Sequence, residues 1–557
     1  MSILTAEFSS AADPSLSFDA KRILFAGKRS AGESWNIWEM NIDGSTKRQL
    51  TKNFGNCLEP SYVATSSITA PEFDDKVRWM IFTSDQTGAY EERGQDLARA
   101  IYAQNTEPIA GRGTVTWRTT YNLSSDFSPT VLGDGRIVFT STQPGGGDHA
   151  QGRYPLLATN WDGTGLNLFL SSHEGPVLKT MACEMPDRTI VFVESSGESR
   201  DGAGQLARVS LQRPLHSREA LSKGEGTYLN PKPLPDGRIL VAFSKAGEGR
   251  AICLFDPATG SAGQAVHQDR NWDDQAAIAV STRPEPQGLI SAVVEPEKTA
   301  DLHCINAYES DLPGAGQIKQ GDIKRVRFVQ GIPAQKSEAV RASAAGGIAP
   351  GHVRTRILGE VPVEDDGSFY VRLAGDTPFY VQLLDSEGMS LQTQRGWIWV
   401  RRGTSRQCLG CHENKELAPE NRVTDALLKM RRHLLTATPE QRRPGADFRH
   451  AVMPVIQAKC RSCHDRAKAR GGLDLGDAAT KSYNRAYESL MADPKGGTKE
   501  HARFILPGSA RRSPLINLLS EAKSAQGSLS KHPAVHLDSN EKRTLVEWID
   551  LGALWEN

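Results

Sequence analysis

Two copies of a cysteine-based motif carry the clearest chemistry in this chain. Each copy has the form Cys-x-x-Cys-His. Two thiols three positions apart can add to the two vinyl groups of one haem, and the adjacent histidine can then bind the iron as its proximal ligand. The sequence therefore predicts two covalently bound haem c groups. Their attachment and ligand residues are expected to be Cys408, Cys411, His412, Cys460, Cys463 and His464.

The same cysteines allow two other interpretations. Two Cys-x-x-Cys pairs can form a four-cysteine zinc site, and a single pair can act as a redox disulfide. About 50 residues separate the pairs here, whereas the halves of one zinc knot usually lie about 15 to 20 residues apart. Zinc also does not require a histidine after each pair. Haem attachment is therefore favoured, and zinc stays a candidate without assigned ligands.

The second haem needs a sixth ligand from the segment that precedes the last predicted helix. His532 and His536 are the candidates there, and Met491 lies earlier in the chain. Each histidine could equally be a solvated surface residue. We favour His532, because Pro533 would stiffen the loop and limit the entropy lost on ligation. No sixth ligand is evident for the first haem, and an open iron position is what substrate chemistry requires.

Other polar side chains are weaker candidates. Arginines and tryptophans cluster before the first motif and could contact haem propionates and the haem ring. We slightly favour a structural explanation, in which these residues belong to a strand with one solvated face and one face in the core. The residues are Arg395, Trp397, Trp399, Arg401, Arg402 and Arg406. Cys183, His303 and Cys304 could bind a metal, but their strand-like surroundings favour buried side chains.

Composition excludes several classes of protein. The 557 residues include 66 Lys+Arg and 66 Asp+Glu, so the formal charge is zero. That balance argues against a nucleic-acid binder or a polybasic membrane-surface protein. Hydrophobic residues make up 38%, as in soluble folded chains rather than disordered ones. No apolar run approaches the roughly 18 residues of a membrane span.

The first residues bear on localisation. They contain no charged segment followed by a long apolar run, so we see no signal peptide. Covalent haem attachment takes place outside the cytoplasmic membrane. We therefore expect a periplasmic or otherwise exported protein whose start is truncated or mis-assigned.

A short repeat organises the first 300 residues. An Asp/Gly-rich turn and a basic residue precede an apolar run, and the copies follow at steps of about 50 to 57 residues. That spacing predicts a six-bladed TolB/WD40-like β-propeller over residues 1–315, and unrelated hairpins in a sandwich are the alternative. The copies end near Phe25, Phe82, Phe139, Phe192, Val241 and Ser291.

The remainder completes a multidomain, mainly β chain. Residues 316–415 predict a small β-sandwich or β-barrel that ends in the first haem motif. Residues 416–445 predict a helical linker. Residues 446–557 predict an α-helical cytochrome c domain whose last helix begins at a capping box, Asp538 with Glu541.

The layout resembles the hydrazine synthase alpha subunit-like family. The segments that carry the resemblance are 359–369, 388–389, 394–397, 408–413, 454–460, 471–475 and 548–553. The resemblance implies a propeller, a middle β-domain and a C-terminal cytochrome c domain. In that family the histidine of the first motif binds zinc, and a tyrosine four residues later binds the haem iron. Position 416 here is Glu, so this iron ligand does not transfer, and the family's zinc-binding cysteine has no counterpart that we can place.

Three functions stay open from the sequence. The chain is expected to be a dihaem electron-transfer or redox protein, with the propeller as a docking platform for a redox partner protein. An alternative is a haem oxidoreductase that acts on a small nitrogen compound at an open first haem. The third is a zinc-stabilised propeller binding protein without haem.

Overall fold

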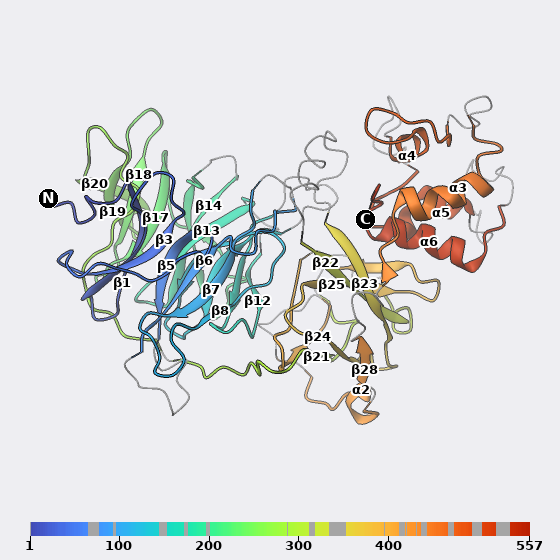
Figure 1. Ribbon diagram of the computed structural model, residues 1–557, viewed down its shortest axis with the longest axis horizontal. Helices are drawn as coiled ribbons and strands as arrows, with labels where there is room; N and C mark the ends of the chain where they lie inside the picture. Colours follow the sequence, from blue (N-terminus) through green and yellow to red (C-terminus); the bar gives the residue numbers. More distant parts are fainter. Residues whose placement is uncertain are drawn as a thin grey trace. The chain divides into compact units, whose positions relative to one another are not determined.

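The computed structural model describes most of the 557 residues (Figure 1). The described ranges are 2–64, 77–92, 96–143, 153–171, 176–196, 201–286, 288–310, 318–333, 353–394, 396–411, 418, 420–430, 432–435, 443–465, 473–492, 504–519 and 535–556. They form two compact units. The first runs to Glu297 and also includes Ile398–Thr404, and the second takes Lys298–Trp397 and the residues from Ser405 onward.

The described part of the first unit holds five four-stranded antiparallel sheets, each built from consecutive strands. The first strands of successive sheets are neighbours, β1 with β5, β5 with β9, β9 with β13 and β13 with β17. The sheets are β1–β4 (Ser10–Leu16, Arg22–Lys28, Asn36–Asn41, Arg48–Gln49), β5–β8 (Cys57–Val63, Trp79–Ser84, Ala100–Asn105, Thr116–Arg118), β9–β12 (Asp126–Val131, Ile137–Ser141, Leu156–Thr159, Asn167–Leu170), β13–β16 (Leu178–Glu184, Thr189–Ser195, Gln205–Ser210, Glu219–Ala220) and β17–β20 (Thr227–Pro233, Ile239–Ser244, Ala251–Asp256, Ser261–His267).

The sequence repeat corresponds to the second strand of each sheet. Its first five copies end on β2, β6, β10, β14 and β18, and all five end residues are buried. The Asp/Gly turn that precedes the run joins the first two strands. In the third sheet, for example, Leu132 N donates to Arg136 O at 2.8 Å across this turn. The prediction of one hairpin per repeat is therefore confirmed for five copies.

The sixth copy of the repeat does not form the predicted strand. Among the described residues of 286–291 there is no strand, and the next strand, β21 (Thr299–Cys304), pairs with β24 and β27 in the second unit. The 286–291 segment instead bonds to the third sheet's final turn, where Trp161 Nε1 donates to Leu289 O at 2.7 Å and Ser291 Oγ donates to Asp162 at 2.9 Å. Because these are isolated contacts rather than a ladder, the described residues of this unit show five four-stranded sheets and do not confirm a sixth blade, and the boundary at 315 stays a prediction.

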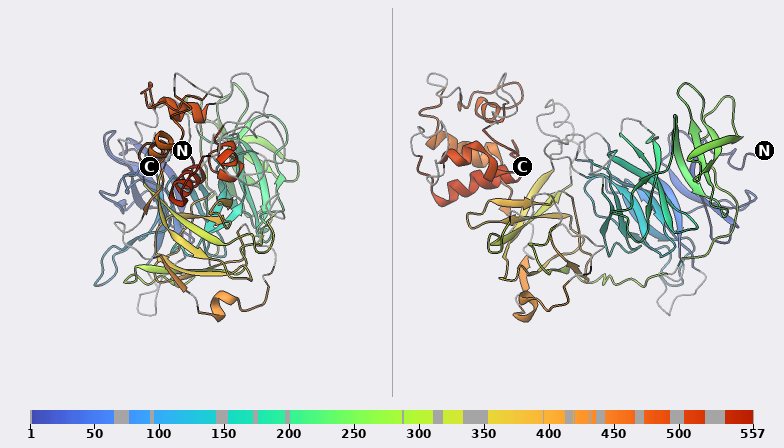
Figure 2. Two further views of the ribbon diagram at one scale, coloured as in Figure 1. Left: turned by 90° about the vertical axis from the view of Figure 1, so that its right-hand side faces the viewer. Right: turned by 180° about the vertical axis from the view of Figure 1, so that it is seen from behind.

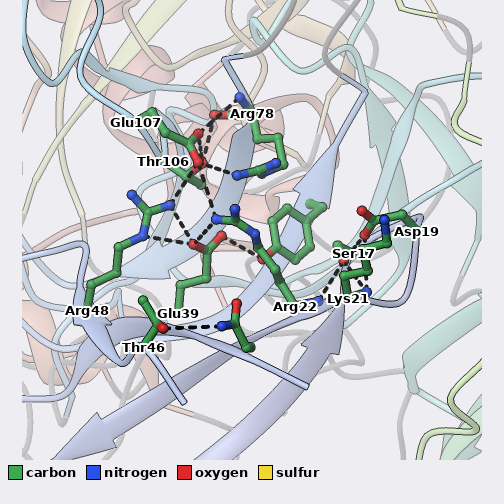
Figure 3. Close-up of polar contacts among 12 residues, drawn as sticks. Ser17, Asp19, Lys21, Arg22, Glu39, Thr46, Arg48, Arg78, Thr106 and Glu107 are labelled. Atoms are coloured by element: carbon green, nitrogen blue, oxygen red, sulfur yellow. Dashed lines mark hydrogen bonds and ion pairs between the residues drawn. The ribbon is translucent and has the colours of Figure 1, made fainter. Parts of the chain in front are cut away.

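Partly buried ion pairs around the buried Glu39 link the first two sheets (Figure 3). Glu39 on β3 receives Arg22 at 3.0 Å and the Nε of Arg48 at 2.8 Å. Arg48 also pairs with Glu107 at 2.9 Å, and Arg78 donates to the same carboxylate. Arg78 and Glu107 flank β6 and β7 of the second sheet, and Arg22 also lies 3.6 Å from Glu107, so two guanidinium groups, those of Arg22 and Arg48, link the carboxylates of the two sheets.

Two sheets form the β part of the second unit. Phe328 and Phe369 pack ring against ring between them, with centroids 6.0 Å apart, which fits the sandwich prediction for the middle region. In spatial order the sheets are β27-β21-β24-β28 and β26-β25-β22-β23-β29. Their further bounds are β22 Arg325–Ile332, β23 Arg354–Pro362, β24 Phe369–Ala374, β25 Phe379–Leu384, β26 Ser390–Thr393, β27 Ser405–Cys408, β28 Arg432–Leu435 and β29 Arg443–Pro444.

The predicted helical linker is wrong. Only one helical turn, α2 (Asp425–Leu428), forms in the described part of 416–445, and β28 follows and pairs in parallel with β24. Met430 has a φ of 48°, in the left-handed region, which ends the helix. The apolar periodicity misled the prediction, because Leu428 and Met430 are exposed rather than packed.

Short helices make up the C-terminal part of the second unit, drawn red in Figures 1 and 2. The predicted capping box is confirmed: Asp538 accepts from Glu541 N at 2.8 Å, and the Glu541 carboxylate accepts from Asp538 N at 2.8 Å. No described helix is both long and apolar enough to cross a membrane. The helical segments are η4 Phe448–Val452, α3 Met453–Lys459, α4 Arg485–Met491, η6 Ala510–Arg512, α5 Pro514–Leu519 and α6 Ser539–Asp550.

Candidate functional site

The second motif forms a single tight turn at the end of α3. Cys460 caps the helix, with its N–H donating to Ile456 O at 2.9 Å. The N–H groups of Cys463 and His464 both donate to Cys460 O at 3.2 Å. The three predicted residues are therefore brought together, with the two sulfur atoms and the imidazole on one turn.

The surroundings of this turn are largely apolar. Cys460 packs against a core that includes Leu545, Val546 and Trp548 of α6. Burial raises the pKa of the Cys460 thiol to about 11, with smaller contributions from Cys463 and Glu541. The thiol is consequently protonated at neutral pH, so nothing in this environment prepares it as a thiolate metal ligand.

His464 is oriented by the chain that follows it. Its carbonyl accepts from Leu475 N at 2.6 Å, and its Nδ1 is buried while the residue as a whole is partly exposed. The ring edge that carries Nε2 is therefore the one suited to bind an iron. These residues fit the attachment and proximal ligation of a haem c.

The first motif lies at the end of β27, against the chain that follows β21. Cys304 and Cys408 are partners across these two parallel strands. Ile305 N donates to Cys408 O at 2.9 Å, and Cys411 N donates to Glu309 O at 3.0 Å. Both cysteines of the motif are thus held by backbone hydrogen bonds to one segment. His412 lies outside the described residues.

Two residues that sequence reasoning missed complete this environment. Gly410 leaves room for the Cys411–Glu309 bond, because a Cβ at position 410 would overlap the Glu309 carbonyl oxygen. Gln392 on β26 donates from Nε2 to Cys411 Sγ at 3.2 Å. Burial raises the pKa of Cys411 to about 12. The only signal in the sequence was the glycine between the two cysteines.

The structure separates the two cysteine pairs. All four cysteines are described, yet within the described ranges no group of three or more Cys, His, Asp or Glu side chains converges as a metal site. A single zinc knot made of both pairs is therefore excluded. Each pair instead has its own neighbours: Cys460 packs against the C-terminal hydrophobic core, and Cys411 bonds to Glu309 and Gln392.

Several of the arginine and tryptophan candidates pack elsewhere than against the motif, whereas Arg406 lies on β27 two residues before Cys408. Trp399 and Arg401 belong to the first unit, where Trp399 Nε1 donates to Gly163 O at 3.2 Å. Arg401 is buried and donates to Tyr121 at 2.9 Å. Trp397 is buried beside Tyr380 in the second unit, and Arg395 lies outside the described residues. A structural role is favoured for this group.

The isolated candidates are core residues. Cys183 is buried among apolar side chains, and burial raises its pKa to about 12. His303 is buried and its Nε2 lies 2.8 Å from Thr424 Oγ1. The prediction of buried rather than metal-binding roles is confirmed for Cys183.

Comparison with known proteins covers the whole chain. The family described as the hydrazine synthase alpha subunit middle domain matches residues 321–413, which include both cysteines of the first motif. Hydrazine synthase subunit alpha of Kuenenia stuttgartiensis is 29% identical over all of this chain and 87% of that protein. The solved Kuenenia stuttgartiensis hydrazine synthase matches with a TM-score of 0.88 at 28% identity, covering 100% of this chain and 90% of that one. Over its whole length the chain therefore resembles the hydrazine synthase alpha subunit.

The distal-ligand candidates of this hydrazine synthase alpha subunit-like chain differ in placement. His536 is exposed, and its carbonyl accepts from Lys459 Nζ at 3.1 Å. Met491 is buried in the hydrophobic core at the end of α4. His532 lies outside the described residues. The assignment of the sixth ligand to His532 stays a prediction.

Proposed function

We propose that this chain is a dihaem c-type cytochrome of its family, with one haem bound through Cys408 and Cys411 and the other through Cys460 and Cys463. The observation that carries the proposal is the second motif, where both sulfur atoms and the His464 imidazole lie on one turn against an apolar core. Haem supplies one-electron redox chemistry when bound. The protein's residues attach it, orient it and exclude water from it.

If the chain is a dihaem cytochrome, roles follow for its other parts. The five four-stranded sheets with neighbouring first strands are the blades of a β-propeller that serves as a docking platform. The C-terminal helices are a cytochrome c domain. Because the named relative is one subunit of an enzyme, we propose that this chain also assembles with other protein subunits or a redox partner protein. Covalent haem attachment places the protein outside the cytoplasmic membrane, in the periplasm or beyond.

The haem content tests the proposal directly. The full chain is exported in a strain that matures c-type cytochromes, and intact mass and a pyridine haemochrome spectrum are recorded. Two haems per chain are expected, Cys408→Ala should remove the first and Cys460→Ala should remove the second. A mass gain of one haem or none in the parent chain would overturn the proposal.

A second function is favoured by the full-length match to a hydrazine synthase. In this alternative the first haem has an open iron position and carries out redox chemistry on a small nitrogen compound. The two functions differ in ligand binding. A first haem with an open position binds CO or NO readily in the ferrous state, whereas a six-coordinate electron carrier does not.

A further inference from the structure

Strand β26 contacts both the first motif and the C-terminal helix α6. At one end, Gln392 Nε2 donates to Cys411 Sγ at 3.2 Å. Two residues earlier, the backbone N–H of Ser390 donates to Asp550 Oδ2 at 2.8 Å. Asp550 is the last residue of α6. A four-residue strand thus connects the first cysteine pair to the helix on which the second motif packs.

Helix α6 continues the connection to the second motif. Glu541 in its first turn pairs with Lys459 Nζ at 3.2 Å, and Lys459 directly precedes Cys460. Along its length, α6 contributes Val546 and Ile549 to the core against which Cys460 packs. The route from Cys411 to Cys460 therefore consists of covalent bonds, two hydrogen bonds and the Glu541–Lys459 ion pair, all within the second unit.

Asp550 is the joint at which strand and helix meet. Its side chain is buried, and its other oxygen, Oδ1, accepts from Ala510 N at 2.7 Å. Its carbonyl accepts from the Nε2 of Gln382 on β25 at 2.9 Å. Burial raises the pKa of Asp550, while the two backbone N–H groups act in the opposite direction. Three hydrogen bonds to one buried residue fix the junction between strand and helix.

We propose that this route, Cys411–Gln392–Ser390–Asp550–α6–Cys460, is the path by which an electron passes between the two haem sites. The inference rests on the dihaem function proposed above. The path carries one electron from a ferrous haem at one motif to a ferric haem at the other, so one iron is oxidised and the other reduced. No bond forms or breaks and no proton moves.

The route along β26 is continuous in covalent and hydrogen bonds. Electronic coupling decays less steeply through covalent and hydrogen bonds than through gaps, and β26 offers a bonded route with its two polar joints held at 3.2 and 2.8 Å. Because Asp550 is buried and has several partners, thermal motion does not interrupt the second joint. A contact with a purely structural role would not require the Gln392 side chain to donate to the Cys411 sulfur, to which the haem would be attached.

The experiment removes the first joint and leaves the strand in place. Gln392→Leu deletes the contact to Cys411, and Gln394→Leu makes the same change two residues along, where only the backbone N–H is seen to bond, to Val381 O. In the mature full chain, electron exchange between the sites is followed after flash photolysis of CO from the half-reduced protein. We expect Gln392→Leu to slow it about tenfold, equivalent to about 1.4 kcal/mol of activation free energy, and Gln394→Leu to leave it unchanged.

The outcomes separate this inference from the function on which it rests. Haem content by mass and the two midpoint potentials are measured for each variant. Two haems, unchanged potentials and equal rates in both leucine variants would overturn the path and leave the dihaem function intact. One haem or none in the parent chain would overturn the dihaem function itself. Asp550→Asn provides a second variant, which should slow exchange through the other joint.

Discussion

The carboxylate of Asp13, on the first sheet, accepts a hydrogen bond from the backbone N–H of Glu59, on the second, at 3.1 Å. The relationship repeats one sheet further on, where the Glu59 carboxylate accepts from Ser128 N at 3.0 Å. All three residues lie at bulges in the first strand of their sheets, with φ between 51° and 54°. Each bulge therefore presents a side chain to the next bulge, and the sheets are linked in series.

Glu59 makes the stability of this linkage dependent on pH. Desolvation of the partly buried carboxyl raises the pKa of Glu59, and the neighbouring Asp13 carboxylate raises it further. A raised folded-state pKa contributes stability that is present below the usual carboxyl pKa and is lost as the pH rises through the folded-state value. Because glutamine carries no charge, Glu59→Gln should become progressively more stable than the parent chain from pH 4 to pH 8, as measured by urea unfolding.

Asp126 provides a second, quantitative pH dependence. The residue is buried, and burial raises its pKa to about 6, although Ser141 Oγ and Asn122 Nδ2 donate to its Oδ1. Between about pH 4 and 6 the parent chain should lose up to about 3 kcal/mol relative to Asp126→Asn, from a pKa shift of about two units. Denaturation series at four pH values measure this difference. Parallel profiles for the two proteins would contradict the assignment.

The sequence predicted the elements whose signals are local. Five hairpins and the capping box at Asp538 followed from turn residues and short periodicities, and they are present as expected. The sixth copy failed because a β-branched run forms a strand only where a neighbouring strand is available. The same competition turned the apolar periodicity around Leu434 into β28, paired with β24.

The candidate site likewise contains some residues that the sequence could reveal and others that it could not. The cysteines could be found because haem attachment needs a fixed spacing, and the glycine at position 410 stood between them. Gln392 and Asp550 could not be assigned a role, since their partners lie 19 and 160 residues away in sequence. Contacts at such separations are created by the fold and leave no periodic signal.

Glu547 should be essential to the stability of the second unit. It lies on α6, is nearly inaccessible to solvent, and pairs with the buried Arg327 of β22 at 3.5 Å and with Arg543 at 2.9 Å. Without the Glu547 carboxylate, the buried Arg327 keeps its pair with Glu360 at 2.8 Å but loses its second acceptor, so Glu547→Ala should lower the free energy of unfolding by about 1.5 to 3 kcal/mol. The control, Glu556→Ala, breaks the exposed pair with Arg449 and should lower it by less than about 1 kcal/mol. Equal losses would contradict the prediction.

Gly410 should be required for haem attachment at the first motif only. In Gly410→Ala the new methyl group meets the carbonyl oxygen of Glu309, so the Cys411 N–H loses its acceptor and the Cys411 sulfur is displaced. We expect the mass of the mature protein to fall by one haem while the second motif stays loaded. Leu409→Ala, at the other variable position of the motif, should keep both haems. Full loading of Gly410→Ala would show that the turn tolerates a side chain.

The last prediction concerns the distal ligand of the second haem. In the proposed haem site His464, on the Cys460 turn, is the proximal ligand, so we expect the sixth ligand to come from the part of the sequence that precedes the cap at Asp538.

Two of the three candidates are poorly placed for this role. Met491 is enclosed in the hydrophobic core, and His536 is exposed with its backbone tied to Lys459. His532 precedes Pro533, whose fixed φ reduces the entropy lost when the loop is ordered by ligation. His532→Ala should therefore convert a low-spin haem to high-spin and open it to CO, while His536→Ala should leave the spectrum unchanged. A spectral change in His536→Ala instead would reverse the assignment, and no change in either variant would point to Met491 or water, because the iron would then keep its ligand without either histidine.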